Sequence, residues 1–144
     1  LAFATVVLAA TVGKDFIVHH FSNYATYEIV DNEDNFESAS ELYIGYIPEG
    51  FRLTDSLSQQ YSRHSVYENE EYHFVVVKDN VNNDVSFNSS YKLEEKISIN
   101  SISYLYYVSD NDITGFIWNY NDYVYRIDGN IPKEELLKIA QSVA

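Results

Sequence analysis

The chain has 144 residues, no cysteine and a formal net charge of −13 at pH 7. This length suits a single domain that buries a sufficient core without disulfides or structural metals. The lack of cysteine excludes disulfide scaffolds, thiolate zinc sites, iron–sulfur clusters and cysteine nucleophiles. The negative charge argues against nucleic acid as a partner, because a phosphate backbone requires a basic surface.

The first thirteen residues, LAFATVVLAATVG, are apolar except for two threonines. A helix needs roughly 20 residues to cross a bilayer, so this run fits the outer end of a membrane helix. Two other interpretations stay open: the apolar part of a signal peptide, although its basic leader is missing, and a buried helix or strand of the domain. We predict an apolar helical segment over residues 1–22 that contacts the membrane. Freed from a membrane, the same run could drive formation of a homodimer.

Residues 23–42 combine a short strand-like stretch with the acidic, polar sequence DNEDNFESASE. Asp31, Glu33 and Asp34 are oxygen donors of the kind that calcium prefers. The central glycine and terminal glutamate of a calcium-binding helix–loop–helix are missing, however. We therefore interpret residues 23–42 as an acidic linker or edge strand and predict no metal site.

Turn and strand patterns dominate the rest of the chain. Ile-Pro-Glu-Gly at 47–50 predicts a type II turn, because proline presets the backbone and Gly50 accepts a positive φ. Strands are predicted from Phe51 onward, over Tyr72–Lys78, and as one long strand from Ile97 to Val108.

The last thirty residues predict a hairpin followed by a helix. Aromatic and β-branched residues alternate over Ile113–Trp118 and Tyr123–Ile127, with a polar turn between them. Pro132 suits the first turn of a helix, and the apolar residues after it recur at helical spacing. Such a short helix is marginal alone, so it must pack on the sheet. We predict an α+β fold over residues 43–144, with an antiparallel β-sheet and the C-terminal helix packed on one face.

No catalytic arrangement is recognisable in the sequence. There is no GxSxG motif and no glycine-rich phosphate loop. His19 and His20 are adjacent, so on a helix they point about 100° apart, and His64 and His73 lack a carboxylate at a recognisable spacing. Pairs of carboxylates arise by chance among 22 acidic residues. We therefore expect no enzyme activity, no cofactor and no catalytic residue.

Fourteen tyrosines against a single tryptophan suggest an aromatic sheet face. Tyr104, Tyr106, Tyr123 and Tyr125 lie at alternating positions of predicted strands and are our candidate ligand-binding residues for a glycan or peptide. Tyrosines on one sheet face more often pack under a helix, so their solvent exposure decides between the two interpretations.

Three segments together resemble a known family: YIPEGFRL at 46–53, GFIWNYNDYVYRIDG at 115–129 and KEELLKIAQSV at 133–143. Their order and spacing are similar to those of the Firmicutes domain of unknown function 4367. The resemblance spans roughly residues 43–144 and excludes residues 1–41. It implies an extracytoplasmic domain after a single membrane helix, in proteins similar to anti-sigma factors or in lipoproteins. It supplies no catalytic residues.

These observations lead us to expect a non-enzymatic extracytoplasmic sensor or interaction domain of a membrane-anchored, anti-sigma-factor-like protein in Gram-positive bacteria. Its partners would be a protein or a cell-wall ligand, and the membrane through residues 1–22. The alternative is an envelope module that recognises a glycan or peptide through the aromatic sheet face. A hydrolase would require a cleft with two close carboxylates, one of them with a raised pKa.

Overall fold

A computed structural model describes residues 4–11, 14–20, 24–31, 39–80, 85–88, 92–109 and 111–144, with the backbone alone described for those before residue 39 and for residues 85–88. Eleven strands and one helix lie in these ranges. The strands are β1 (Ala4–Thr11), β2 (Lys14–His20), β3 (Tyr24–Asp31), β4 (Arg52–Gln59), β5 (Ser62–Glu68), β6 (His73–Asn80), β7 (Val85–Asn88), β8 (Lys92–Ile99), β9 (Ile102–Val108), β10 (Thr114–Tyr120) and β11 (Tyr123–Gly129), and the helix is α1 (Lys133–Gln141).

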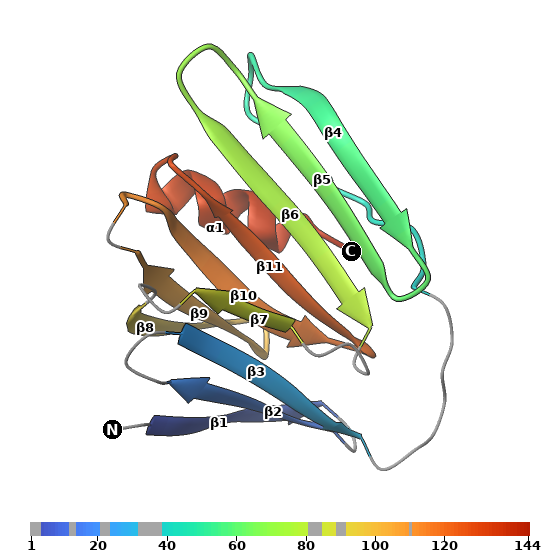
Figure 1. Cartoon of the computed structure of the whole chain (residues 1–144), viewed down its shortest axis with the longest axis vertical. Helices are drawn as coiled ribbons and strands as arrows, with labels where there is room; N and C mark the ends of the chain where they lie inside the picture. Colours follow the sequence, from blue (N-terminus) through green and yellow to red (C-terminus); the bar gives the residue numbers. More distant parts are fainter. Residues whose placement is uncertain are drawn as a thin grey trace.

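The described strands form two antiparallel sheets (Figure 1). One has the order β1-β2-β3-β7, and the other has the order β4-β5-β6-β11-β10-β9-β8. The larger sheet joins two meanders, β4 to β6 and β8 to β11, through pairing of β6 with β11 from Tyr123↔Asn80 to Gly129↔Phe74. This pairing of distant segments makes a single sheet out of two locally formed units.

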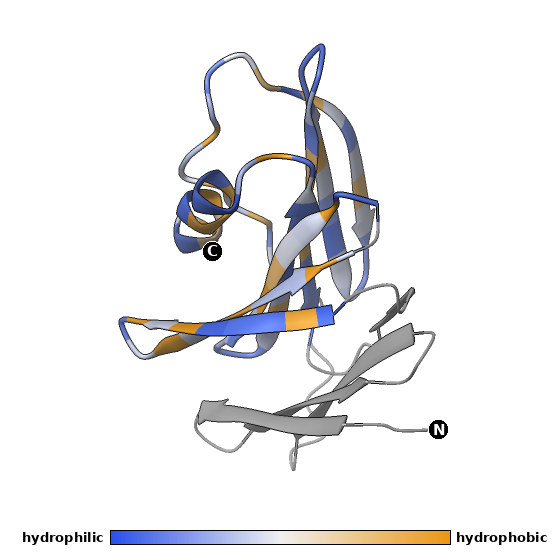
Figure 2. Ribbon diagram, turned by 90° about the vertical axis from the view of Figure 1, so that its left-hand side faces the viewer, coloured by the Kyte–Doolittle hydropathy of each residue, from blue (hydrophilic) through white to orange (hydrophobic). Residues whose placement is uncertain are grey.

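Helix α1 covers one face of the larger sheet at β10 and β11 (Figure 2). It follows Pro132, and Glu134 and Glu135 occupy its first turn, where the helix dipole favours negative charge. Its buried residues Leu136 and Ile139 pack into the aromatic core of the sheet. The predicted antiparallel sheet with a C-terminal helix on one face is therefore confirmed, in a fold that is mostly β.

The opposite face of the central strands is buried as well. Val77, Ile117 and Val124 alternate with the α1-facing residues of their strands, yet each is only 1 % exposed. With both faces covered, β10 has four consecutive buried residues, Gly115 to Trp118. A run of this kind is typical of a strand in the interior of a domain.

Two local predictions need correction. The single strand from Ile97 to Val108 is wrong, because a hairpin turn at Asn100 and Ser101 separates β8 from β9, with φ values of 50° and 67°. Left-handed residues at both positions fit the two-residue turns whose twist matches paired strands. The turn at Gly50 is confirmed by its φ of 88°, but the Phe51 N–H donates to Pro48 O, which places the turn one residue later than predicted.

Within the predicted apolar helical segment of residues 1–22, the structure describes the backbone of residues 4–11 and 14–20, and the other residues lie outside the described ranges. What is described there is the backbone of β1 and β2, which pair with each other in extended conformation. Glu33 and Asp34 of the calcium alternative also lie outside the described residues. Among the helices that the structure describes, none has the length and hydrophobicity needed to span a membrane.

Candidate functional site

The four tyrosines singled out from the sequence lie on the α1-facing side of the larger sheet. They join a continuous series of ring contacts, in which Tyr125 stacks on Trp118 at 5.4 Å and Trp118 meets Tyr104 at 5.3 Å between ring centroids. Tyr104 and Tyr125 are each only 3 % exposed, so both belong to the core and neither presents a ring to solvent. Tyr106 and Tyr123 are half-buried and remain accessible in part.

Each of the two accessible rings carries a lysine over its face. Lys78 Nζ lies 4.3 Å from the centroid of the Tyr123 ring, and Lys133 Nζ lies 4.5 Å from that of Tyr106. Lys133 also pairs with Glu95. Cation–π contacts of this kind are attractive, so a sugar ring that stacks on either of these faces must first displace an ammonium group.

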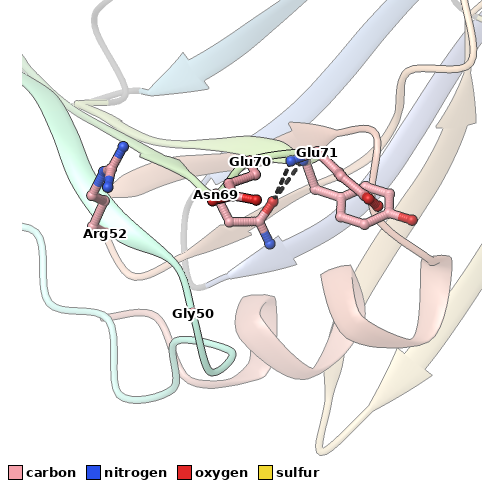
Figure 3. Close-up of a pocket in the computed structure, with 6 residues that line it drawn as sticks. Gly50, Arg52, Asn69, Glu70 and Glu71 are labelled. Carbon is pink, nitrogen blue, oxygen red and sulfur yellow. Dashed lines mark hydrogen bonds between the residues drawn. The ribbon is translucent and has the colours of Figure 1, made fainter.

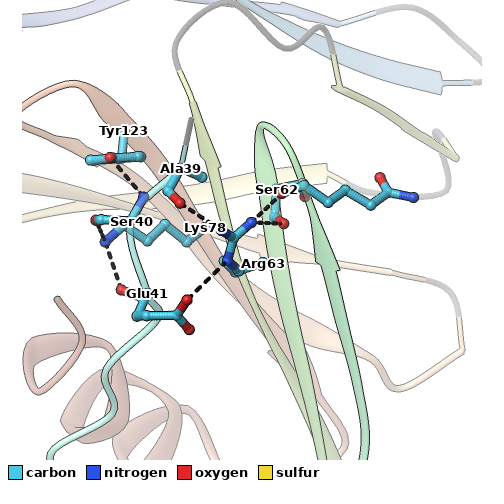
Figure 4. Close-up of polar contacts among 8 residues, drawn as sticks. Ala39, Ser40, Glu41, Ser62, Arg63, Lys78 and Tyr123 are labelled. Atoms are coloured by element: carbon cyan, nitrogen blue, oxygen red, sulfur yellow. Dashed lines mark hydrogen bonds and ion pairs between the residues drawn. The ribbon is translucent and has the colours of Figure 1, made fainter. Parts of the chain in front are cut away.

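A second group of polar contacts surrounds Lys78 (Figure 4). Residues Ala39–Glu41, which we call the strap, run without regular secondary structure against β5, β6 and β11. Lys78 Nζ donates to Ser40 Oγ at 2.8 Å and to the Glu41 carbonyl oxygen at 3.0 Å. The Ser40 N–H donates to the Tyr123 hydroxyl at 3.0 Å. Tyr123 thus acts in this site through its hydroxyl as well as its ring.

Arg63 holds the other end of the strap. Its Nη2 donates to the Ala39 carbonyl oxygen at 2.7 Å, and the Ala39 N–H donates to the Gln60 carbonyl oxygen at 2.7 Å. Its Nε lies 3.9 Å from the carboxylate of Glu41, whose side chain is 91 % exposed. Arg63 and Lys78 are register partners on β5 and β6, so the two cations stand side by side beneath the strap.

The cationic groups at this site donate their hydrogen bonds mainly to carbonyl oxygens. Lys78 is only 3 % exposed, and no ion pair joins it to a carboxylate in the part of the chain that the structure describes. Burial lowers the pKa of Lys78, an effect that the neighbouring charge of Arg63 reinforces and that Tyr123 and Glu41 oppose. Two adjacent cations served by main-chain oxygens are unusual in a chain with 22 acidic and 9 basic residues.

The free energy that holds the strap in place is small. A hydrogen bond contributes about 0.5–1.5 kcal/mol net, or about 1.5–3 kcal/mol where one partner is charged. Fixing each residue of the strap costs about 1–2 kcal/mol of backbone entropy. The net free energy of attachment is therefore only about a few kcal/mol, well below that of the sheet core.

Ser62, His64 and Asp79 lie together on the opposite face of β5 and β6. Ser62 Oγ donates to the carboxylate of Asp79, while His64 Nε2 lies 2.8 Å from the same Oγ. A hydroxyl has one proton, so with that proton directed to Asp79 the His64 ring nitrogen serves as a donor to Ser62. Ser62 is also buried at 3 % exposure, which keeps substrates away from its hydroxyl. Burial lowers the pKa of His64, partly offset by Asp79.

An open, polar pocket of about 400 Å³ lies beside the turn that contains Gly50 (Figure 3). Arg52, Asn69 and Glu70 are among its lining residues. Asn69 Oδ1 accepts hydrogen bonds from the N–H groups of Glu71 and Tyr72 at 2.9 and 2.7 Å, which fixes the β5–β6 turn. The lining is polar and mixed in charge, unlike the apolar pockets in which most small ligands bind.

Of the residues at this site, the sequence pattern predicts Tyr123 but not Ser40, Arg63 or Lys78. The only sequence signal among these three residues is Lys78, a charged residue at the end of the apolar run YHFVVVK. Across the described ranges, no group of three or more His, Asp or Glu side chains is placed to hold a metal ion.

The fold and site thus define an antiparallel α+β domain in which the strap, the segment that leads into the domain, is hydrogen-bonded across the sheet. A family model described as Domain of unknown function (DUF4367) matches residues 41–143, and the chain belongs to this family. The match begins at the last residue of the strap and ends at Val143, which forms a bridge with Ile44. No curated protein matches the chain.

Proposed function

We propose that the chain is a non-enzymatic extracytoplasmic sensor or interaction domain of a single-pass membrane regulatory protein, similar to anti-sigma factors. The family to which the chain belongs supports this proposal, as does the apolar character of residues 1–13. Residues 1–22 provide the attachment to the membrane, and the domain acts by binding a protein or cell-wall component.

The observation that carries the proposal is the strap. The polypeptide that enters the family domain is clamped to the sheet by Arg63 and Lys78 at the point where the family match begins. A change in the sheet that alters this clamp shifts the strap, whereas β3, which precedes the strap, is held by its pairing with β7. Such an arrangement suits a domain that reports its state along its own chain.

The alternative, an envelope module that binds a glycan or peptide through its tyrosines, draws less support. Of the four candidate tyrosines, Tyr104 and Tyr125 are buried, and the rings of Tyr106 and Tyr123 already carry lysines. Only Tyr123 belongs to a site with further polar groups available to a ligand.

Fractionation of cells that produce the complete native polypeptide tests the proposal. A tag after Ala144, which is exposed, marks the protein without disturbing the core. We expect the tag in the membrane pool, where protease added to intact protoplasts removes it. Recovery of a protease-resistant tag in the cytosolic pool would contradict the proposal.

A further inference from the structure

The strap is bound to the sheet in the way that a receptor binds an extended peptide. Its main chain has both kinds of polar group engaged: the N–H groups of Ala39 and Ser40 donate, and the carbonyl groups of Ala39 and Glu41 accept. One side chain is also recognised, since Lys78 donates to Ser40 Oγ. Ala39 is only 3 % exposed, so little more than a methyl group fits at its position.

The site retains donor capacity that the strap does not use. Arg63 Nε is buried and has no hydrogen-bond acceptor among the described residues, and the carboxylate of Glu41 is 3.9 Å away on a largely exposed side chain. A carboxylate placed closer to Arg63 Nε would supply the missing acceptor and oppose the charges of the buried Lys78 and the partly buried Arg63. The site is therefore better suited to an acidic peptide whose carboxylate lies closer to Arg63 Nε than that of the strap does.

We propose that the groove formed by Arg63, Lys78 and Tyr123 is a peptide-binding site that the chain closes with its own strap. Its ligand is an extended segment of a partner protein, with a small residue, then serine or threonine, then an acidic residue. Recognition is mainly by hydrogen bonds between side chains of the sheet and the main chain of the peptide, with the middle hydroxyl on Lys78 and the carboxylate on Arg63. Binding of the partner displaces the strap from the sheet.

The strap competes with the partner for the groove because the strap is covalently connected to the domain. The strap meets its groove at the high effective concentration of a tethered ligand, so a free peptide binds only weakly while the strap is seated. A change that unseats the strap removes this competitor and raises the apparent affinity of the groove. This inference deepens the proposed function by naming the interaction site, but its test does not depend on membrane attachment.

A labelled copy of residues 37–42, fluorescein-ESASEL-amide, is the probe, and fluorescence polarisation with the full chain is the measurement. Ser40→Pro removes both the N–H that meets Tyr123 and the hydroxyl that meets Lys78. We expect this variant to bind the probe at least tenfold more tightly than the unmodified chain. Adding Lys78→Met should reverse the gain, whereas adding Lys92→Met, at an exposed lysine on β8, should leave it unchanged.

Hydrogen exchange of the unmodified chain tests the proposal without any substitution. Excess probe should accelerate exchange of the Ser40 amide at least severalfold, while the Ile127 amide in the centre of the sheet exchanges at its original rate. Unchanged exchange at Ser40, or a folded Ser40→Pro chain that binds the probe no better than the unmodified one, would overturn the proposal. A concentration-dependent dimer abolished by Lys78→Met would assign the groove to the strap of a second copy and equally overturn the partner assignment.

Discussion

Strands β10 and β4 have similar lengths and the same antiparallel hydrogen bonding, yet they differ completely in burial. In β10, four consecutive residues are buried, because both faces of the strand are covered. In β4, all eight residues are exposed. Backbone pairing alone therefore does not distinguish the centre of this sheet from its edge. This difference indicates that aromatic packing at the centre of the sheet supplies the stability. The strap groove lies between the centre and the β4 edge, on β5, β6 and β11.

The largest expected effect is the loss of a central aromatic ring. Phe116 is fully buried and contacts the rings of Tyr104 and Tyr106, so Phe116→Ala should lower the free energy of unfolding by about 3–5 kcal/mol. Leu57→Ala on β4 should change it by less than about 0.5 kcal/mol, since Leu57 is 45 % exposed. Urea unfolding followed by Trp118 fluorescence measures both, and equal losses would abolish the distinction between centre and edge.

Alkaline pH should destabilise the centre through its buried tyrosines. Burial raises the pKa values of Tyr104 and Tyr125 above the ordinary value of 10.0. Because the folded-state pKa is raised, their contribution is fully present below pH 10 and is lost as the pH rises toward the folded-state value. The slope is about 1.4 kcal/mol per pH unit for each such tyrosine. Urea unfolding between pH 8 and pH 11 should show this loss, and Tyr125→Phe should reduce its slope.

Substitutions at two glycines allow the cost of steric crowding at the centre of the sheet to be compared with the cost of backbone conformation at a turn. A Cβ on Gly129 would lie 2.3 Å from the His73 carbonyl oxygen, so Gly129→Ala should cost about 1–3 kcal/mol through displacement of β6. Gly50 has open space around it but a φ of 88°, and Gly50→Ala should cost about 1 kcal/mol through backbone conformation alone. Thermal unfolding of the two variants measures the difference, and a larger cost at Gly50 would reverse the order.

The smallest expected effect is a gain at the β8–β9 turn. Ser101 has a φ of 67°, which glycine adopts without a steric penalty. Ser101→Gly should therefore stabilise the chain by about 1 kcal/mol, as judged by the urea midpoint at an unchanged m-value. An unchanged or lowered midpoint would mean that the hairpin contributes nothing to the unfolding transition. The matched control is Ser98→Gly within β8, which should destabilise the same strand.

Local sequence signals determined the elements whose residues are neighbours in the chain. The β10–β11 hairpin and α1 could be predicted because alternation, Pro132 and the apolar helical spacing are all read within about thirty residues. The Asn100–Ser101 turn escaped prediction because it lacks the glycine that usually marks a two-residue hairpin. The family resemblance was also readable, since two of its three motifs lie in the β10–β11 hairpin and α1 and the third lies at the Gly50 turn.

Only the tertiary structure decided the rest. Pairing of β6 with β11 joins residues about fifty positions apart, and it places Lys78 beside Tyr123 and Tyr125. The strap site combines Ser40, Arg63, Lys78 and Tyr123 from four separate segments, and no spacing in the sequence relates them. Burial likewise separated Tyr104 and Tyr125 from Tyr106 and Tyr123, although all four alternate in the same way. Periodicity specifies which face a side chain occupies, but what covers that face depends on contacts between distant parts of the chain.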